Sequence, residues 1–186
     1  MEVIETPLKG LLLLKNTIIG DARGYFLECF HKKKFMELTG WEGEFVQANQ
    51  SLSRKNVIRG LHFQTGSSAQ GKLVRVLKGK VIDTILDVRP DSPTFGQSYS
   101  VELDDSNTYQ LFVPRGFAHG FSVLSDEAAF YYKCDNYYDR TAEEAINPLD
   151  PELNIDWKIP AGDMILSDKD RQAKTWAEYK KHIGAG

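Results

Sequence analysis

The stretch KLVRVLKGKVIDTILDV, residues 72–88, decides the fold class of this chain. It contains two runs rich in branched apolar residues, 72–77 and 81–88, on either side of Lys78-Gly79-Lys80, a break typical of a β-hairpin. In the second run, mostly apolar even positions alternate with Asp83 and Asp87 on the opposite face, as in a strand with one face on a core. By periodicity alone we expect both carboxylates to be solvated. If the sheet closes into a barrel, the face that carries the two carboxylates would point inward and line a pocket instead.

Short strands and turns continue outward from this stretch along the chain. They recur roughly every 8–12 residues, which is typical of a sandwich or barrel. The further strands are expected over residues 11–14, 25–30, 45–53, 57–59, 97–103, 109–113, 117–124 and 128–134. Helices are expected over 31–38, ending at Thr39-Gly40, and over 167–181, which begins with a polar cap. The sequence therefore predicts one all-β domain, 1–186, with short peripheral helices and a helical C-terminal tail at about 167–183.

Composition excludes several classes of protein. The 186 residues include 23 Lys and Arg and 26 Asp and Glu, a net charge of −3, so we expect no nucleic-acid partner. Apolar residues make up 41% of the chain, yet the run Leu11–Leu14 is far shorter than the roughly 20 residues of a membrane helix. Cys29 and Cys134 form no CxxC pair, and the N-terminus lacks the layout of a signal peptide. We expect a cytoplasmic, soluble protein.

Two of the four histidines have surroundings suited to chemistry. His62, in IRGLHFQ, and His119, in PRGFAHGF, lie among apolar and aromatic residues, whereas His31 and His182 are expected at the surface. An imidazole that titrates near neutral pH is a natural proton acceptor, although a single such residue is as well explained as a hydrogen-bonded core histidine. The chain has no HxH, HExxH or GxSxG motif, so neither a metal site nor a serine nucleophile is expected.

A series of segments, in chain order, carries a resemblance to a known family. They are DARGYFLE (21–28), VQANQS (46–51), RGLHFQ (59–64), GKLVRV (71–76), DVRPDSPTFG (87–96), PRGFAHGF (114–121), YKC (132–134), IDW (155–157) and SDKDR (167–171). With these segments the chain resembles the dTDP-4-dehydrorhamnose 3,5-epimerase family of the cupin superfamily. The match covers most of the chain, and its strength lies in the ordered set rather than in any one motif.

The resemblance implies a cupin-type jelly-roll barrel, a homodimer with N-terminal strands (about residues 1–30) exchanged between subunits, and neither metal nor cofactor. It further implies an isomerase that converts dTDP-4-dehydro-6-deoxy-D-glucose to dTDP-4-dehydro-L-rhamnose, in dTDP-L-rhamnose and polysaccharide biosynthesis. The alternatives are a single-carbon 3-epimerase or ketoisomerase on a related dTDP-4-keto-6-deoxy sugar, and a catalytically silent cupin that binds sugar nucleotides.

The resemblance also assigns catalytic roles. His62 is the implied base, Asp170 its partner, Lys72 the group that stabilises the enolate, and Tyr132 the proton donor on the opposite face. His119, supported by Asp83, completes the polar pocket. The residues alone leave other interpretations open: Ser167-x-x-Asp170 also fits a helix capping box, Lys72 an ordinary charge at a strand end, and Tyr132 a core aromatic.

Substrate-binding residues are implied in the same way. Besides Lys72 and His119 they are Arg23, Phe26, Glu28, Gln47, Asn49, Arg59, Tyr138, Glu143 and Lys169. Arginine forks suit diphosphate oxygens, and the aromatics match positions near the thymidine. The resemblance places Arg23, Phe26 and Glu28 in the neighbouring subunit's site. The chain departs from the family's common pattern at Gln50, Ala145, Pro148 and Leu149, near the expected nucleotide side.

Overall fold

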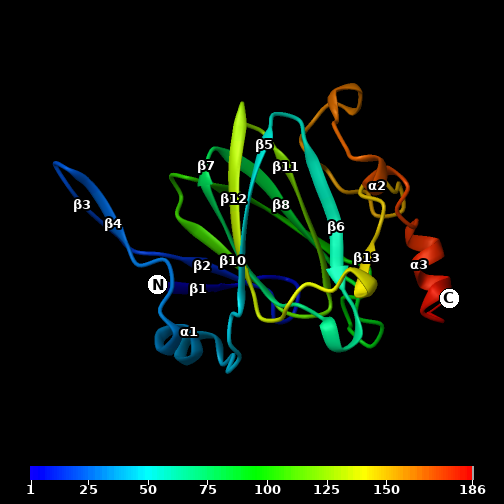
Figure 1. The fold of residues 1–186 in the computed structure, drawn as a ribbon, viewed down its shortest axis with the longest axis horizontal. Helices are drawn as coiled ribbons and strands as arrows, with labels where there is room; N and C mark the ends of the chain where they lie inside the picture. Colours follow the sequence, from blue (N-terminus) through cyan, green and yellow to red (C-terminus); the bar gives the residue numbers. More distant parts are fainter. Residues whose placement is uncertain (186) are drawn as a thin grey trace.

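A computed structural model describes residues 1–185. Most strands of the chain form two antiparallel sheets that face each other (Figure 1). One sheet has six strands in the order β1-β2-β10-β7-β12-β5, and the other five, in the order β13-β6-β11-β8-β9. The first consists of β1 (Glu2–Glu5), β2 (Leu12–Lys15), β10 (Tyr109–Val113), β7 (Lys72–Lys78), β12 (Glu127–Cys134) and β5 (Gln47–Arg54). The second consists of β13 (Glu143–Ala145), β6 (Ile58–Gln64), β11 (Phe117–Val123), β8 (Lys80–Asp87) and β9 (Ser98–Asp104). The predicted all-β class is confirmed.

The break at Lys78-Gly79-Lys80 is a corner between the two sheets, so the expected hairpin is wrong. β7 pairs with β10 and β12, whereas β8 pairs with β9 and β11. Gly79 makes the corner possible because its φ is +81° and a Cβ there would lie 2.1 Å from the carbonyl oxygen of Glu127. The two runs of residues 72–88 thus supply one strand to each wall of the sandwich.

Three clusters of apolar side chains hold the layers together. The main core lies between the sheets and includes Val74 of β7, Ile85 of β8 and Phe130 of β12. The outer face of the five-stranded sheet is covered by the C-terminal segment, whose Trp157 and Trp176 are buried. The outer face near β2 is covered by α1 (Lys32–Thr39), through Phe35. Single turns of 3₁₀ helix span Gly66–Ser68, Arg140–Ala142 and Ala161–Asp163.

The predicted C-terminal helix is broken into two, which corrects the expectation of one helix over 167–181. α2 spans Asp168–Arg171 and α3 spans Trp176–His182. Between them, Lys174 forms a parallel bridge with Ile146, and its carbonyl accepts a hydrogen bond from the Asn147 N–H at 2.8 Å. A capping box of Thr175 and Glu178 then begins α3.

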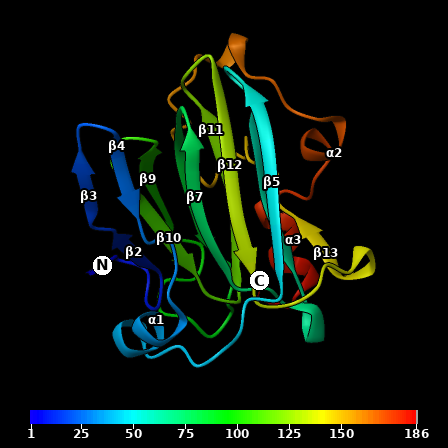
Figure 2. The same cartoon turned by 60° about the vertical axis from the view of Figure 1, so that its left-hand side comes forward.

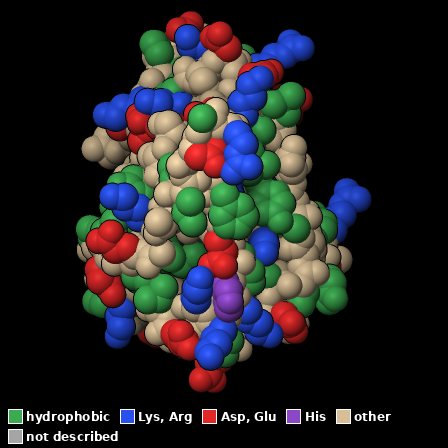
Figure 3. Space-filling view, turned by 90° about the vertical axis from the view of Figure 1, so that its left-hand side faces the viewer, with side chains coloured by type: hydrophobic (Ala, Val, Ile, Leu, Met, Phe, Trp, Pro, Cys, Tyr) green, Lys and Arg blue, Asp and Glu red, His purple; other side chains and the backbone are tan. Residues whose placement is uncertain are grey.

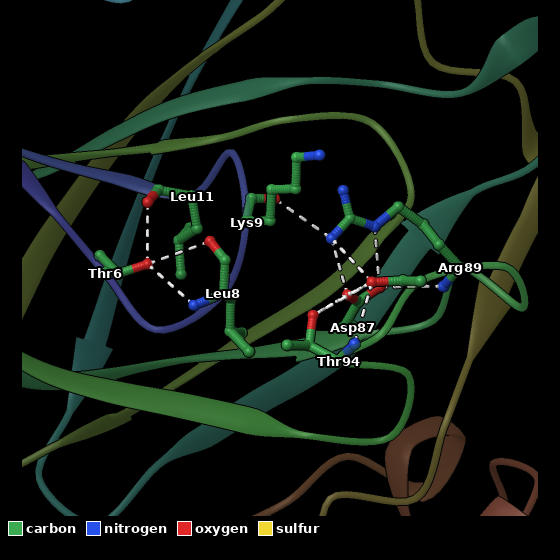
Figure 4. Close-up of polar contacts among 8 residues, drawn as sticks. Thr6, Leu8, Lys9, Leu11, Asp87, Arg89 and Thr94 are labelled. Carbon is green, nitrogen blue, oxygen red and sulfur yellow. Dashed lines mark hydrogen bonds and ion pairs between the residues drawn. The ribbon is translucent and has the colours of Figure 1, made fainter.

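Asp83 and Asp87 are both fully buried, so the expectation of solvated carboxylates is wrong. Each is compensated by specific partners, which period-two alternation does not reveal. Asp87 accepts hydrogen bonds from Arg89, from Ser92 at 2.6 Å and from Thr94 at 2.6 Å. Figure 4 shows that Arg89 also reaches the carbonyl of Lys9, at 3.2 Å, in the turn between β1 and β2.

The segment that follows β2 leaves the body of the molecule as a hairpin of β3 (Ile18–Asp21) and β4 (Gly24–Leu27) (Figures 1 and 2). β1 and β2 themselves pair within the six-stranded sheet of the same chain. The strands β1, β3 and β13 are additional to those expected from the sequence. On the side from which the hairpin projects, apolar side chains lie among charged ones (Figure 3). No helix within residues 1–185 is long and apolar enough to cross a membrane.

Candidate active site

A cavity of about 390 Å³ opens between the two sheets and is lined by side chains from both. The five-stranded sheet contributes His62 and Arg59 from β6 and His119 from β11. The six-stranded sheet contributes Lys72 from β7 and Tyr132 from β12. Candidate residues from distant segments of the sequence therefore share one cavity.

His62 and Asp170 form a close pair although they are 108 residues apart in the chain. The Nε2 atom of His62 lies 2.6 Å from Oδ1 of Asp170, and the Asp170 side chain is only 5% exposed. Burial opposes ionisation of this carboxyl, but hydrogen bonds from His62 and Ser167 outweigh it and lower the pKa of Asp170. The pair is therefore an imidazole held by an ionised carboxylate, the arrangement of a positioned general base.

Ser167 fixes the short helix that carries Asp170. Its hydroxyl oxygen accepts a hydrogen bond from the Asp170 N–H at 3.1 Å and so caps α2. Ile165, just before this cap, forms a parallel bridge to Val57, which precedes β6. The sequence left open whether Asp170 belongs to a helix cap or pairs with His62. In the structure its backbone N–H takes part in the cap and its carboxylate pairs with His62.

A second imidazole and carboxylate pair lies beside the first. His119 Nε2 is 2.6 Å from Asp83 Oδ1, and both side chains are buried. His119 is directly opposite His62 in the ladder between β11 and β6, so the two rings enter the cavity from adjacent strands. The second oxygen of Asp83, Oδ2, is buried without a hydrogen-bond partner among the described residues.

The facing sheet supplies a phenol and an ammonium group. Burial raises the pKa of Tyr132, so its phenol stays protonated at neutral pH. Burial lowers the pKa of Lys72, whose Nζ donates to the His62 carbonyl at 3.4 Å. Within residues 1–185, no carboxylate forms an ion pair with Lys72. A protonated phenol and the buried amino group of Lys72 thus face the histidines across the cavity.

Further polar side chains line the cavity, from β5 and from Arg59 of β6. Gln47 Nε2 donates to Asn49 Oδ1 at 3.1 Å, and the Asn49 amide contacts the Cys134 sulfur at 3.8 Å. Arg59 donates from Nε to the Ser53 hydroxyl at 2.8 Å. Within residues 1–185 the terminal nitrogens of this guanidinium have no hydrogen-bond partner, so they can meet an anion.

The rim of the cavity is closed by three linked side chains. The Tyr138 hydroxyl donates to Glu143 at 2.9 Å, and the Lys169 ammonium lies 2.6 Å from the same carboxylate. Burial opposes ionisation of Glu143, but hydrogen bonds from Lys169 and Tyr138 outweigh it and lower the pKa of this carboxyl. The rim therefore links β13 to the residue that precedes Asp170.

Besides Lys169, which reaches the cavity only through Glu143, three expected binding residues do not line it. Arg23 and Phe26 are on the projecting hairpin, and Glu28 follows it. Arg23 pairs with Asp21 in solvent, and Glu28 pairs with Lys34 at 2.8 Å. The phenyl ring of Phe26 is exposed.

Sequence reasoning missed two glutamines that line the cavity. Gln64 is two residues after His62 on β6, so period two already puts both on one face of the strand. Gln70 lies in the loop before β7, where no local pattern points inward. Among the described residues, no group of three or more His, Cys, Asp or Glu side chains is arranged to hold a metal ion.

Comparison with known proteins finds close relatives. A family model described as dTDP-4-dehydrorhamnose 3,5-epimerase matches residues 5–178. The dTDP-4-dehydrorhamnose 3,5-epimerase of Shigella flexneri is 48% identical over 170 residues, which cover 91% of this chain and 93% of that protein. The crystal structure of the enzyme of that name from Elizabethkingia anophelis NUHP1 is 51% identical, with a TM-score of 0.91, and the match covers 95% of this chain and 97% of that one.

A further solved relative contains a bound sugar nucleotide. It is the dTDP-6-deoxy-D-glucose-3,5-epimerase of Legionella pneumophila Philadelphia 1 in complex with dTDP-4-keto-L-rhamnose. It is 47% identical, with a TM-score of 0.90, and the match covers 94% of this chain and 92% of that one. The shared fold confirms the predicted cupin jelly roll. By its sequence and its fold alike, the chain belongs to the dTDP-4-dehydrorhamnose 3,5-epimerase family.

Proposed function

We propose that this protein is an isomerase that epimerises dTDP-4-dehydro-6-deoxy-D-glucose at C3 and C5 to dTDP-4-dehydro-L-rhamnose, as a step of dTDP-L-rhamnose biosynthesis. The observation that carries the proposal is the arrangement across one cavity. His62 of one sheet, paired with Asp170 of α2, lies on one side, and Tyr132 and Lys72 of the other sheet lie on the opposite side. A base and an acid on opposite sides of a bound ring are what inversion at carbon requires.

The chemistry follows from the ketone at C4. Hydrogens at C3 and C5 are acidic because the electron pair left by either proton is delocalised onto the C4 oxygen. His62 removes the proton and becomes an imidazolium, which the ionised Asp170 stabilises. The C–H electron pair forms a C–C double bond to C4, and the carbonyl becomes an enolate. Lys72, which forms no ion pair with a carboxylate within residues 1–185 and whose charged form Asp83 and Glu143 favour, stabilises the charge on that oxygen.

Tyr132 completes the inversion from the other face. Its phenol gives a proton to the same carbon, and the carbonyl forms again. The raised pKa of Tyr132 supports this role, because only a protonated phenol can donate. Exchange with solvent returns a proton to the tyrosinate and takes one from the imidazolium. The second carbon then reacts in the same way, with no net change in the enzyme.

The remaining polar groups suit the nucleotide end of the substrate. The terminal guanidinium nitrogens of Arg59, which bond to none of residues 1–185, suit the diphosphate, and Tyr138 offers an aromatic face at the rim for the thymidine. His119 and Asp83 hold the polar end of the pocket near the sugar. Gln47, Asn49, Glu143 and Lys169 complete the proposed contacts.

The homodimer is part of the proposal. The β3–β4 hairpin exposes Ile18, Ile19, Tyr25 and Phe26, of which Ile19 and Phe26 are each 66% exposed. β5, which carries Gln47 and Asn49, is the last strand of its sheet and so has a free edge. An exchanged hairpin docked along that edge would cover its own apolar residues and bring the partner's Arg23, Phe26 and Glu28 towards the cavity. Free thiols at Cys29 and Cys134 suit the cytoplasm, the proposed location.

Deuterium incorporation tests the activity. The protein is incubated with dTDP-4-dehydro-6-deoxy-D-glucose in deuterated water, and the recovered sugar is analysed by mass spectrometry and NMR. Deuterium at both C3 and C5 of an L-rhamno product is the expected result. No deuterium at either carbon, with the nucleotide still bound, would identify a silent sugar-nucleotide binder instead.

A single-carbon 3-epimerase is the second candidate. One base and one acid, His62 and Tyr132, are enough for inversion at one carbon, so the same groups suit either reaction. Deuterium at C3 alone, with C5 unlabelled after many turnovers, would select this candidate. A product with its carbonyl moved to another carbon would select a ketoisomerase.

A further inference from the structure

The loop that carries Tyr138 is held by the side chains of three glutamines. They come from three separate places: Gln47 from β5, Gln64 from β6 and Gln70 from the loop before β7. All three line the cavity, and Gln64 and Gln70 are 6% and 9% exposed. Each is hydrogen-bonded to the backbone of the segment 136–139.

The three contacts differ in direction. Gln47 Oε1 accepts from the Tyr138 N–H at 3.0 Å, and Gln64 Oε1 accepts from the Asp139 N–H at 2.9 Å. Gln70 instead donates from Nε2 to the Asn136 carbonyl at 2.8 Å. Because a backbone N–H can only donate and a carbonyl can only accept, these partners fix which end of each amide faces the loop.

This arrangement fixes Tyr138 at both ends. Its backbone N–H is bonded to Gln47 and that of the next residue to Gln64, while its hydroxyl donates to Glu143. The ring is nevertheless half exposed, with 51% of the residue accessible, so packing alone does not hold it. Removing one glutamine amide leaves a backbone group of the loop without its partner and frees the loop to move.

We propose that Gln64 and Gln70 are positioning residues, which together with Gln47 hold the segment 136–139 as a preformed wall for the nucleoside of the substrate. The inference deepens the proposed function and rests on it, because the wall matters only if a dTDP-sugar binds against Tyr138. None of the three glutamines touches the reacting carbons in this scheme. Their effect is on nucleotide affinity, since a wall that is already ordered costs less conformational entropy on binding.

Amide hydrogen exchange tests the clamp itself, in the absence of ligand. In Gln64→Ala and Gln70→Ala, exchange of the Tyr138 and Asp139 amides should accelerate by about three- to tenfold, the range expected for one hydrogen bond. Substitution by glutamate should affect the two positions differently. Gln64→Glu keeps an oxygen that accepts from the Asp139 N–H, so amide exchange should stay slow. Gln70→Glu has no N–H to donate to the Asn136 carbonyl, so amide exchange should accelerate. Gln97→Ala, at an exposed residue, is the matched control.

Ligand affinity tests the consequence. The dissociation constant for dTDP should rise by about three- to tenfold in the two alanine variants. The constant for inorganic pyrophosphate, which has no nucleoside to meet the wall, should stay at its wild-type value. A purely structural defect would weaken both ligands.

The outcomes separate the two proposals. Unchanged exchange in both alanine variants overturns the clamp. Faster exchange with unchanged dTDP affinity, or an equal loss of dTDP and pyrophosphate affinity, overturns the positioning role. A wild-type protein that does not bind dTDP defeats the proposed function, while the exchange experiment still decides whether the glutamines hold the loop.

Discussion

Replacement of Asp87 by Asn should remove a favourable electrostatic contribution to the stability of the barrel. Asp87 is fully buried, at the end of the sandwich where Arg89 links it to the turn between β1 and β2 (Figure 4). Burial opposes ionisation of this carboxyl. Hydrogen bonds from Arg89, Ser92 and Thr94 outweigh it, and lower the pKa of Asp87 from 3.8 to about 2.

The magnitude follows from those two pKa values. Their difference corresponds to about 2.5 kcal/mol of folding free energy at neutral pH. Because the pKa is lower in the folded state, the contribution is fully present above about pH 4 and is lost as the pH falls through about 2. We therefore expect D87N to lower the free energy of unfolding by about 2.5 kcal/mol at pH 7, and to lower Tm by about 5–10 °C for a chain of this size.

Urea unfolding at fixed protomer concentration measures the effect. Wild type and D87N are compared at pH 7, 5, 4, 3 and 2.5, with D91N, at an exposed position of the same loop, as the control. The difference in the free energy of unfolding between wild type and D87N should be constant down to about pH 4 and then become smaller. The free energy of unfolding of D91N should stay within about 0.5 kcal/mol of wild type. A gap below 0.5 kcal/mol at pH 7, or one that persists unchanged at pH 2.5, would refute the reasoning.

The remaining predictions concern the site and the dimer. His62→Asn should slow deuterium incorporation by at least about 10²-fold while dTDP still binds; retained incorporation removes His62 from the role of base. Tyr132→Phe should slow product formation more than it slows proton abstraction, which is measured as loss of deuterium from a substrate labelled at C3 and C5. An equal decrease of the two rates counts against the role of Tyr132 as donor. Asp170→Asn should lower kcat by about 10²- to 10⁴-fold with little change in dTDP affinity, because the imidazolium loses its counter-charge; an unchanged kcat contradicts this. Ile19→Asp, on the hairpin, should shift the mass measured by light scattering from dimer towards monomer, with Ile165→Asp, exposed at the C-terminal segment, as control.

The strands were predictable because they are encoded locally. Alternation and turn residues located the strand at Tyr109–Val113 to the residue and most others within one or two residues. β13 was not foreseen, since Glu143–Ala145 has no apolar alternation and is a strand only because it pairs with β6. The corner at Gly79 was misjudged for a similar reason: a hairpin and a sheet-to-sheet corner use the same turn residues, and only the partners of β7 and β8 distinguish them.

The site was predictable only in part. Periodicity put Asp83 opposite the apolar face of its strand and so predicted a solvated carboxylate, because it could not show that His119, from another strand, compensates its burial. The break between α2 and α3 had a local signal in Thr175-x-x-Glu178 that marks a second helix start. Gln70 had none, because its role depends on the backbone of a loop 66 residues further along the chain.

The distance in sequence between His62 and Asp170 bears on how the protein is made. Every strand from β1 to β12 is complete by Cys134, so most of the sandwich has been synthesised before Asp170 is added to the chain. Chains fold from the N-terminus as they emerge. The cavity can therefore close around an imidazole that still lacks its carboxylate, and His62 gains that partner only when α2 docks against the barrel.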